Sequence, residues 1–367
     1  MERSDRRNRE KRYVAGESDH IVAETAARIF ADLADPQTIN RAKDDAWKAP
    51  LWRALSEAGL TRAWVPENLG GAGASLADGF EILRAAGRVA LPLPLAETLT
   101  AGWLLAQAGI EMPDGAMTIA PARSQDRVEI GPDGTLSGRA ACVPFAQDAE
   151  HIVVFADGER SMVALANISR CRVGEGRSLA GEPSNLVTFE RVKPLKSAAA
   201  PGGLDTNALM LMGAAVRAMQ TAGALEAILE LSVAYANERV AFERKIGKFQ
   251  AVQQNLARLA GETAAALAAA GSAADAIANA DTFDNAVMLE VASAKIRCAE
   301  AAAEGAAIAH QVFGAIGFTN EHVLHRFTLR MLGWRDDFGN ESWWAAELGK
   351  SVAKRGADEF WPLVASR

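Results

Sequence analysis

Cysteine and histidine are both scarce in this chain. The 367 residues include three cysteines, Cys142, Cys171 and Cys298, which are odd in number and far apart. They form neither a disulfide framework nor a metal cluster, and a cytoplasmic location follows most simply. The five histidines show no HExxH pattern and no Cys/His spacing. We therefore expect no metal site.

Long apolar runs and an excess of basic residues are also missing. No uninterrupted apolar run reaches the roughly 18 residues that a membrane span needs, so we expect no membrane span. The net charge of −7 disfavours a dedicated nucleic-acid binder, which would usually be basic. Residues 1–16 are dense in charged, largely basic side chains with no apolar stretch behind them. They predict a disordered tail, not a signal peptide.

Apolar residues at helical spacing dominate both ends of the chain. Val22, Ala26, Ile29 and Leu33 share one helix face and begin a helical region that we assign to residues 17–115. Residues 201–367 contain three long apolar stripes, with Asp205, Thr206 or Asn207 as candidate caps of the first helix. Such long helices predict an antiparallel bundle, extended by oligomerisation.

The middle of the chain has the alternation of strands. Ile152–Phe155 and Met162–Leu165 flank Asp157-Gly158, which predicts a hairpin, and Pro132-Asp-Gly134 predicts another turn. We assign a small β domain to residues 116–200, with Pro194–Gly203 as its exit linker. The predicted fold class is therefore mainly α with a small β domain.

Two segments carry a resemblance to a known family. Arg239-Val-Ala-Phe-Glu-Arg-Lys-Ile-Gly-Lys-Phe-Gln250 lies between two long helical segments, and Gln311-Val-Phe-Gly-Ala-Ile-Gly-Phe-Thr319 closes a third. Together they resemble the paired signature of the acyl-CoA dehydrogenase flavoproteins. Trp52–Leu60, Val65–Gly73 and Leu91–Thr98 resemble that family's N-terminal segments. The resemblance implies an N-terminal helical domain, a middle β domain, a C-terminal four-helix bundle and FAD.

The first segment carries the candidate pyrophosphate contact. A pyrophosphate has fixed negative charge, which guanidinium groups and backbone N–H groups bind well. The resemblance implies that Arg239 binds the FAD pyrophosphate across a dimer interface, that Phe242 lies near the adenine and that Gln250 opens the next helix. On spacing alone, Arg239 is one surface cation among several in this loop.

The second segment carries the candidate flavin contacts. The resemblance implies that Gln311 and Gly314 contact the cofactor, where a small residue lets the backbone approach closely. A plain helix stop with glycine after the last turn explains Gly314 equally well and does not exclude contact with the cofactor.

The chain departs from the family pattern in two places. Glu243 stands where the family typically has glycine, so a carboxylate lies near the expected phosphate in a backbone position suited to glycine. Pro121–Arg127 replaces a longer family segment that supports flavin and substrate. This shortened form resembles members that act on bulky CoA thioesters, including those with α2β2 assembly.

The resemblance also implies a carboxylate base, which removes the α-proton while flavin N5 takes the β-hydride. Such a base works best when burial raises its pKa. The ungapped match places Phe338 at the family's glutamate, so we choose Asp337 first, Asp336 second and Glu341 third. The family's alternative position, near Gly213, offers no carboxylate. A second interpretation is at least as good: Asp336 and Asp337 cap a turn or pair with Arg335 in solvent.

The expected function is FAD-dependent α,β-dehydrogenation of an acyl-CoA in lipid or steroid catabolism. Electrons would pass to an electron-transfer flavoprotein or a similar acceptor. The expected assembly is a homodimer, a homotetramer or an α2β2 heterotetramer. Two alternatives stay open: a weakly active or non-catalytic subunit of a heteromeric dehydrogenase, and a helical scaffold that binds no ligand.

Overall fold

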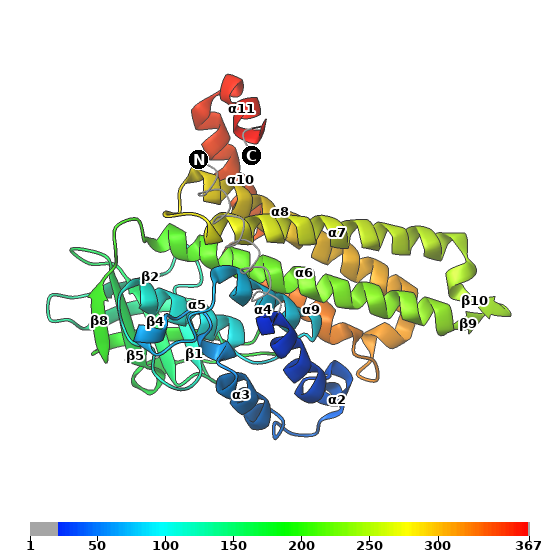
Figure 1. Ribbon diagram of the computed structural model, residues 1–367, viewed down its shortest axis with the longest axis horizontal. Coiled ribbons are helices and arrows are strands. Elements are labelled where there is room, and N and C mark those ends of the chain that lie inside the picture. Colours follow the sequence, from blue (N-terminus) through cyan, green and yellow to red (C-terminus); the bar gives the residue numbers. More distant parts are fainter. Residues whose placement is uncertain (1–20, 366–367) are drawn as a thin grey trace, which may run out of the picture.

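The computed structural model describes residues 21–365, so the predicted tail at 1–16 lies outside the described residues. The chain forms helices, then two small sheets, then long helices, which confirms the predicted fold class (Figure 1).

The N-terminal helices pack into one apolar core, and α2 (Pro36–Arg41) and α4 (Leu76–Arg88) begin at polar caps. Residues 21–33 are helical, and the Asp35 side chain then accepts a hydrogen bond from Thr38 N at 2.7 Å. Ser75 and Asp78 form a reciprocal capping box that fixes the start of the fourth helix. The elements are α2 Pro36–Arg41, α3 Lys48–Glu57, α4 Leu76–Arg88 and α5 Leu95–Gln107.

Two four-stranded sheets enclose a second apolar core. The predicted hairpin is confirmed, because Ala156 pairs with Met162 across residues 157–161. The predicted turn at Pro132–Gly134 joins β2 and β3. One sheet has the order β1 Met117–Ala120, β4 His151–Ala156, β5 Met162–Asn167 and β8 Lys196–Ala199; the other has β2 Arg127–Ile130, β3 Leu136–Pro144, β7 Ser184–Val192 and β6 Arg172–Val173.

The linker predicted at Pro194–Gly203 is wrong in part, because Lys196–Ala199 forms β8. This strand pairs with β5, with Lys196 opposite Leu165 and Ala199 opposite Met162. An edge strand is held by backbone hydrogen bonds on one side, so it needs no alternating apolar pattern. The sequence therefore gave no periodic signal for it.

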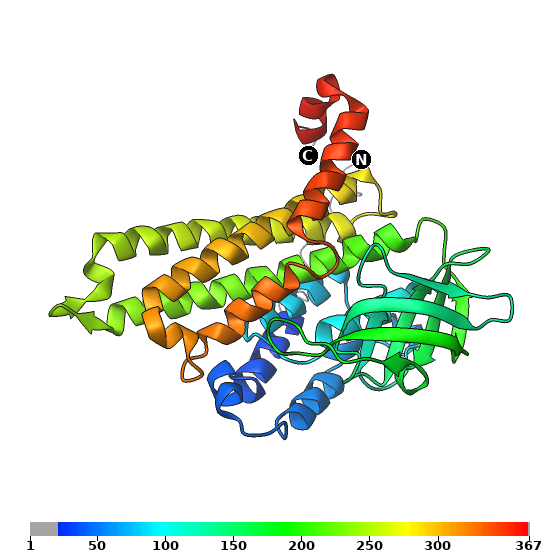
Figure 2. The same cartoon turned by 180° about the vertical axis from the view of Figure 1, so that it is seen from behind.

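The C-terminal helices form the bundle, with α6 at its centre (Figure 2). Asp205 caps α6, as one of the three predicted candidates, by accepting a hydrogen bond from Ala208 N at 2.8 Å. The short strands β9 and β10 form a hairpin between α6 and α7. The elements are α6 Thr206–Glu238, β9 Val240–Ala241, β10 Arg244–Lys245, α7 Gln250–Ala278, α8 Asn285–Phe313, α9 Leu324–Trp334, α10 Glu341–Arg355 and α11 Phe360–Ala365.

Helix α6 is apolar enough and long enough to cross a membrane by length and composition alone. Its most apolar window is entirely buried inside the protein, however. It therefore has the environment of a core helix, covered by α4, α7, α8 and α9.

The bundle is elongated, and its two ends differ. The sheets lie beside the N-terminal half of α6, whereas the β9–β10 hairpin lies at the opposite end (Figure 1). Anything bound between the sheets and the helices is therefore far from the hairpin.

Candidate functional site

Arg239 lies at the end of α6 and opens the β9–β10 hairpin. Its backbone N–H donates to Tyr235 O at 2.8 Å and thereby closes the last turn of the helix. Its side chain is exposed, and it forms no ion pair or hydrogen bond with any described residue. The guanidinium is therefore available to an external anion.

The tip of the hairpin has a left-handed backbone. Phe242 and Glu243 have φ of 50° and 65°, and the Phe242 side chain is 89% exposed. A non-glycine residue in this region costs about 1 kcal/mol, which explains why glycine suits position 243. The hairpin thus presents an exposed aromatic ring and keeps its shape at some conformational cost.

The second cofactor segment lies at the same end of the bundle. Phe313, between Gln311 and Gly314, stacks on Tyr235 with ring centroids 4.3 Å apart. That contact brings the end of α8 against the end of α6. Gln311 and Gly314 are exposed, and no atom lies within 4 Å of a Cβ built on Gly314. The backbone there is open to close approach.

The five predicted cofactor residues therefore share one exposed surface at the hairpin end: Arg239, Phe242, Gln250, Gln311 and Gly314. A free guanidinium, an exposed ring and two amide side chains are groups that fit a dinucleotide. The two sheets lie at the opposite end of the molecule from the hairpin (Figure 2).

Asp337, the first candidate base, lies between α9 and α10 and faces the middle of α6. Its Oδ2 accepts a hydrogen bond from Arg217 Nε at 2.9 Å, and its side chain is 19% exposed. Asp336 is exposed, and Glu341 is ion-paired with Arg335. Of the three predicted carboxylates, only Asp337 reaches the interior.

Arg217 connects Asp337 to a second, deeper carboxylate. Its Nη2 donates to Glu97 Oε1 at 2.6 Å, and its Nη1 donates to Gln220 Oε1, also at 2.6 Å. Arg217 and Glu97 are both buried. Burial raises the pKa of Glu97, and the charge of Arg217 opposes this shift.

Lys295 of α8 completes this inner charged cluster, which we define as Glu97, Arg217, Lys295 and Asp337. Its Nζ donates to Trp334 O at 2.5 Å and to Asp337 O at 2.8 Å. Burial lowers the pKa of Lys295 to about 8. These two hydrogen bonds connect α8 to the end of α9 and to the turn that follows it.

Phe338 occupies the space beside the inner charged cluster. Its side chain is buried, and a Cβ built on Gly213 would lie 2.3 Å from the ring. The glycine therefore makes room for the ring. The adjoining cavity, lined by Arg217, Trp334 and Asp337, has a volume of about 20 Å³. It has room for about one water molecule and none for an acyl chain.

Sequence reasoning missed Glu97, Arg217 and Lys295. The available signal was a charged residue inside an otherwise apolar helical stripe, as at Glu97 within Leu95–Leu105. A buried charge needs a partner, so a charged residue in one apolar stripe indicates that an oppositely charged residue lies in another. Which of them meet depends on the packing of three helices.

The two candidate sites are far apart in one chain. Arg217 lies in α6 and Arg239 caps its C-terminal end, 22 positions further along the chain, which is roughly 33 Å along the axis at 1.5 Å per residue. Within residues 21–365, no group of three or more His, Cys, Asp or Glu side chains is arranged to hold a metal ion.

Comparisons with known proteins match this architecture. Residues 16–112 match the family model "Acyl-CoA dehydrogenase, N-terminal domain", and residues 204–339 match "Acyl-CoA dehydrogenase, C-terminal domain". The chain is 30% identical to acyl-CoA dehydrogenase IpdE2 of Mycobacterium tuberculosis over 94% of this chain and 98% of that protein.

Two solved structures have the same fold. The ChsE4-ChsE5 complex from Mycobacterium tuberculosis matches with a TM-score of 0.81 and 22% identity over 93% of this chain and 98% of that one. A Tcur3481-Tcur3483 steroid ACAD variant matches with a TM-score of 0.81 and 24% identity over 93% of this chain and 99% of that one.

Proposed function

The chain belongs to the acyl-CoA dehydrogenase family, whose members are FAD-dependent oxidoreductases, and on that premise we propose that it completes the flavin site of a different chain in a heteromeric dehydrogenase. The assembly would act on a bulky, steroid-derived acyl-CoA in the cytoplasm and pass electrons to an electron-transfer flavoprotein.

One observation carries the part of this proposal that places the flavin site between two chains: the exposed surface around Arg239 lies at one end of α6, far from the inner charged cluster. Arg239 is roughly 33 Å along α6 from Arg217. A dinucleotide seated in this chain's own cleft could not contact Arg239. A dinucleotide that protrudes from a neighbouring chain could, and the exposed guanidinium is free to bind its phosphates.

The interior of the chain supports an assembly of two different subunits, in which the partner carries the catalytic base. Phe338 and the inner charged cluster fill the space where a thioester and a base would meet. Asp337 stays a prediction as base, but its Oδ2 already accepts from Arg217. We therefore favour the alternative interpretation, in which the α-proton is removed by a carboxylate of the partner.

Two similar structures support the heteromer and the substrate class. One is the complex of two chains, ChsE4 and ChsE5, and the other is a steroid ACAD. The bound flavin would supply hydride acceptance. This chain's own residues would hold the pyrophosphate through Arg239, stack Phe242 near the adenine and keep water from that end of the cofactor.

Affinity purification of the tagged chain from its native host tests the proposal. We expect a second acyl-CoA dehydrogenase chain of different sequence to co-purify in equal amount, and the complex to be yellow. The chain expressed alone should bind little FAD. A homo-oligomer with full flavin occupancy and turnover would overturn the proposal, and an assembly without any flavin would favour the scaffold.

The Asp337→Asn variant of the complex separates the two interpretations of this residue. Because the base would lie on the partner, we expect turnover per bound flavin to stay within about twofold of the wild type. If Asp337 is the base, turnover per flavin should fall by several orders of magnitude while flavin stays bound.

A further inference from the structure

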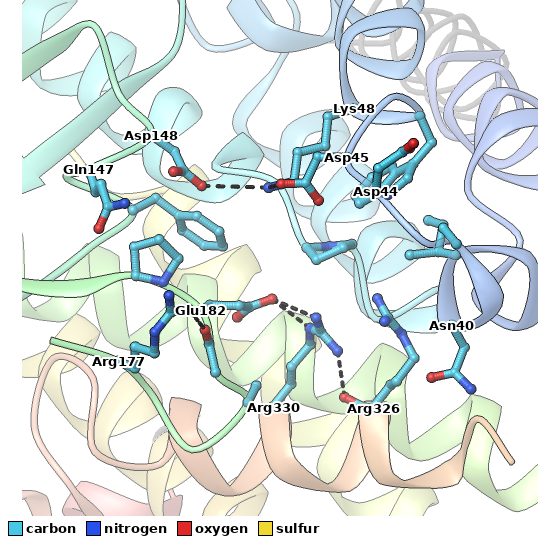
Figure 3. A pocket seen from close by; sticks show the side chains of 18 of the residues that line it. Asn40, Asp44, Asp45, Lys48, Gln147, Asp148, Arg177, Glu182, Arg326 and Arg330 are labelled. Atoms are coloured by element: carbon cyan, nitrogen blue, oxygen red, sulfur yellow. Dashed lines mark hydrogen bonds and ion pairs between the residues drawn. The ribbon is translucent and has the colours of Figure 1, made fainter. Parts of the chain in front are cut away.

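A second, larger cavity lies between the N-terminal helices, the sheets and α9. It has a volume of about 460 Å³, which is within the range of small-molecule sites. The α2–α3 connection, the segment after β3, the loop before β7 and helix α9 line it (Figure 3). None of the residues discussed above as cofactor or base candidates belongs to it.

Most of the charges in its wall are paired with each other. Lys48 forms ion pairs with Asp45 at 2.9 Å and with Asp148 at 3.9 Å. Arg330 forms one with Glu182 at 2.7 Å, and both side chains are largely buried. These pairs combine three carboxylates with two cations, so together they carry one negative charge.

Three cations of the wall remain without a carboxylate partner among the described residues. They are Lys43, Arg177 and Arg326, against one unpaired carboxylate, Asp44. Arg177 donates only to a backbone oxygen, Gly181 O, at 2.6 Å, which leaves its charge uncompensated. With the paired groups included, the lining carries five cations and four carboxylates, an excess of one positive charge.

Arg326 is the cation that most needs a partner. Its side chain extends from α9 into the cavity (Figure 3), and its Nε is buried without a hydrogen-bond partner. Burial, together with the charge of Arg330, lowers the pKa of Arg326 to about 10. The Arg326 side chain is half-buried, and a buried N–H without a partner is costly, so an anion bound beside the guanidinium would satisfy it.

We propose that this cavity binds a phosphate group, with Arg326 as the principal contact and Arg177 and Lys43 as supporting cations. A phosphate monoester has three strong acceptor oxygens, so it can accept hydrogen bonds from more than one of these cations at once, which a carboxylate with two oxygens does less well. A guanidinium donates to two phosphate oxygens at once. The phosphate can come from inorganic phosphate or from a phosphorylated small molecule that fills the remaining volume.

Isothermal titration calorimetry on the purified full chain tests this site, with sodium phosphate and with ADP as separate probes. Sodium chloride holds the ionic strength constant, because surface cations bind anions weakly in a salt-dependent way. We expect saturable binding of phosphate to the wild type. Tighter binding of ADP would identify a phosphorylated small molecule as the ligand class, and equal or weaker binding would identify inorganic phosphate.

Arg326→Gln is the decisive variant, and Arg53→Gln, an exposed arginine of α3 outside the cavity, is its matched control. We expect Arg326→Gln to weaken phosphate binding at least tenfold, Arg326→Lys to weaken it less, and Arg53→Gln to leave it unchanged. Without phosphate, Arg326→Gln should keep or raise the melting temperature, because it removes an uncompensated charge.

The proposal is overturned if neither probe binds, or if Arg326→Gln binds phosphate as tightly as Arg53→Gln does. It is also overturned if Arg326→Gln lowers the melting temperature in phosphate-free buffer, because the guanidinium would then have a structural partner. These measurements involve neither flavin nor a partner chain, so their failure leaves the subunit proposal untouched.

Discussion

At the scale of residues, a few buried charges distinguish this chain. Glu97 and Arg217 are both about 3% exposed and are paired at 2.6 Å. Breaking such a pair from one side costs about 3–5 kcal/mol, because the remaining charge is left without a partner. Removal of one member of the inner charged cluster should therefore destabilise the fold more than removal of an exposed charge.

Lys295 should make the stability of the fold depend on pH. Its pKa is about 8 in the folded protein and 10.5 when unperturbed, so the folded state binds fewer protons in between. The contribution of Lys295 to stability is therefore complete above pH 10.5, its pKa in the unfolded chain. It is lost as the pH falls through about 8, its pKa in the folded protein.

When the pH rises from 7.5 to 9.5, the free energy of unfolding of the wild type should increase by about 2 kcal/mol more than that of Lys295→Met. Urea unfolding of both proteins at the two pH values measures this gain. A difference between the two proteins that is independent of pH would show that Lys295 titrates outside this window.

At the scale of elements, close contact between α4 and α6 depends on glycine. A Cβ on Gly87 would lie 2.1 Å from Gln220 O, and a Cβ on Gly223 would lie 2.1 Å from Arg84 O. The two backbones are therefore nearly in contact. Two ion pairs also connect α4 to α6. Arg84 pairs with Glu226 at 2.7 Å, and Arg88 pairs with Glu230 at 2.9 Å.

Gly223→Ala should destabilise the chain by about 1–3 kcal/mol, because the new methyl group forces the two helices apart. Gly261→Ala in α7 is the control, since nothing lies within 4 Å of its Cβ. It should stabilise the chain by about 0.5–1 kcal/mol through helix propensity alone. Thermal unfolding of both variants measures the contrast. If the two variants shift stability in the same direction, the close helix contact is not the cause.

At the scale of the whole molecule, the hairpin and the sheets lie at opposite ends of one bundle (Figure 1). The hairpin end carries the exposed residues that we propose as cofactor contacts. On that proposal, the chain contributes to a flavin site through association with another chain. Assembly and cofactor binding should therefore be coupled.

Arg239→Ala should reduce the affinity of the assembled complex for FAD roughly 10- to 100-fold, the expected cost of losing charge-assisted hydrogen bonds to a phosphate. Arg53→Ala, an exposed arginine remote from the hairpin, should leave the flavin content unchanged. The ratio of flavin absorbance to protein absorbance after dialysis measures the loss. An unchanged ratio in Arg239→Ala would remove the pyrophosphate role from this residue.

The sequence by itself determined the order of elements and several local features. Helical stripes, the hairpin at Asp157-Gly158 and a cap among residues 205–207 all depend on residues near one another in the chain, and the structure confirms them, with Asp205 as the cap. The paired segments at Arg239 and Gln311 likewise sufficed to indicate the family, which the comparisons show.

Only the tertiary structure decided which distant residues meet. Glu97, Arg217, Lys295 and Asp337 come from four separate elements, and their pairing follows from how those elements pack. The same holds for Arg326, whose lack of a partner depends on residues far from it in sequence. Strand β8 was missed because backbone hydrogen bonds to β5 hold it, and these leave no pattern in the side chains. The energy of a buried charge is set by its three-dimensional surroundings, and a sequence pattern reports only its neighbours along the chain.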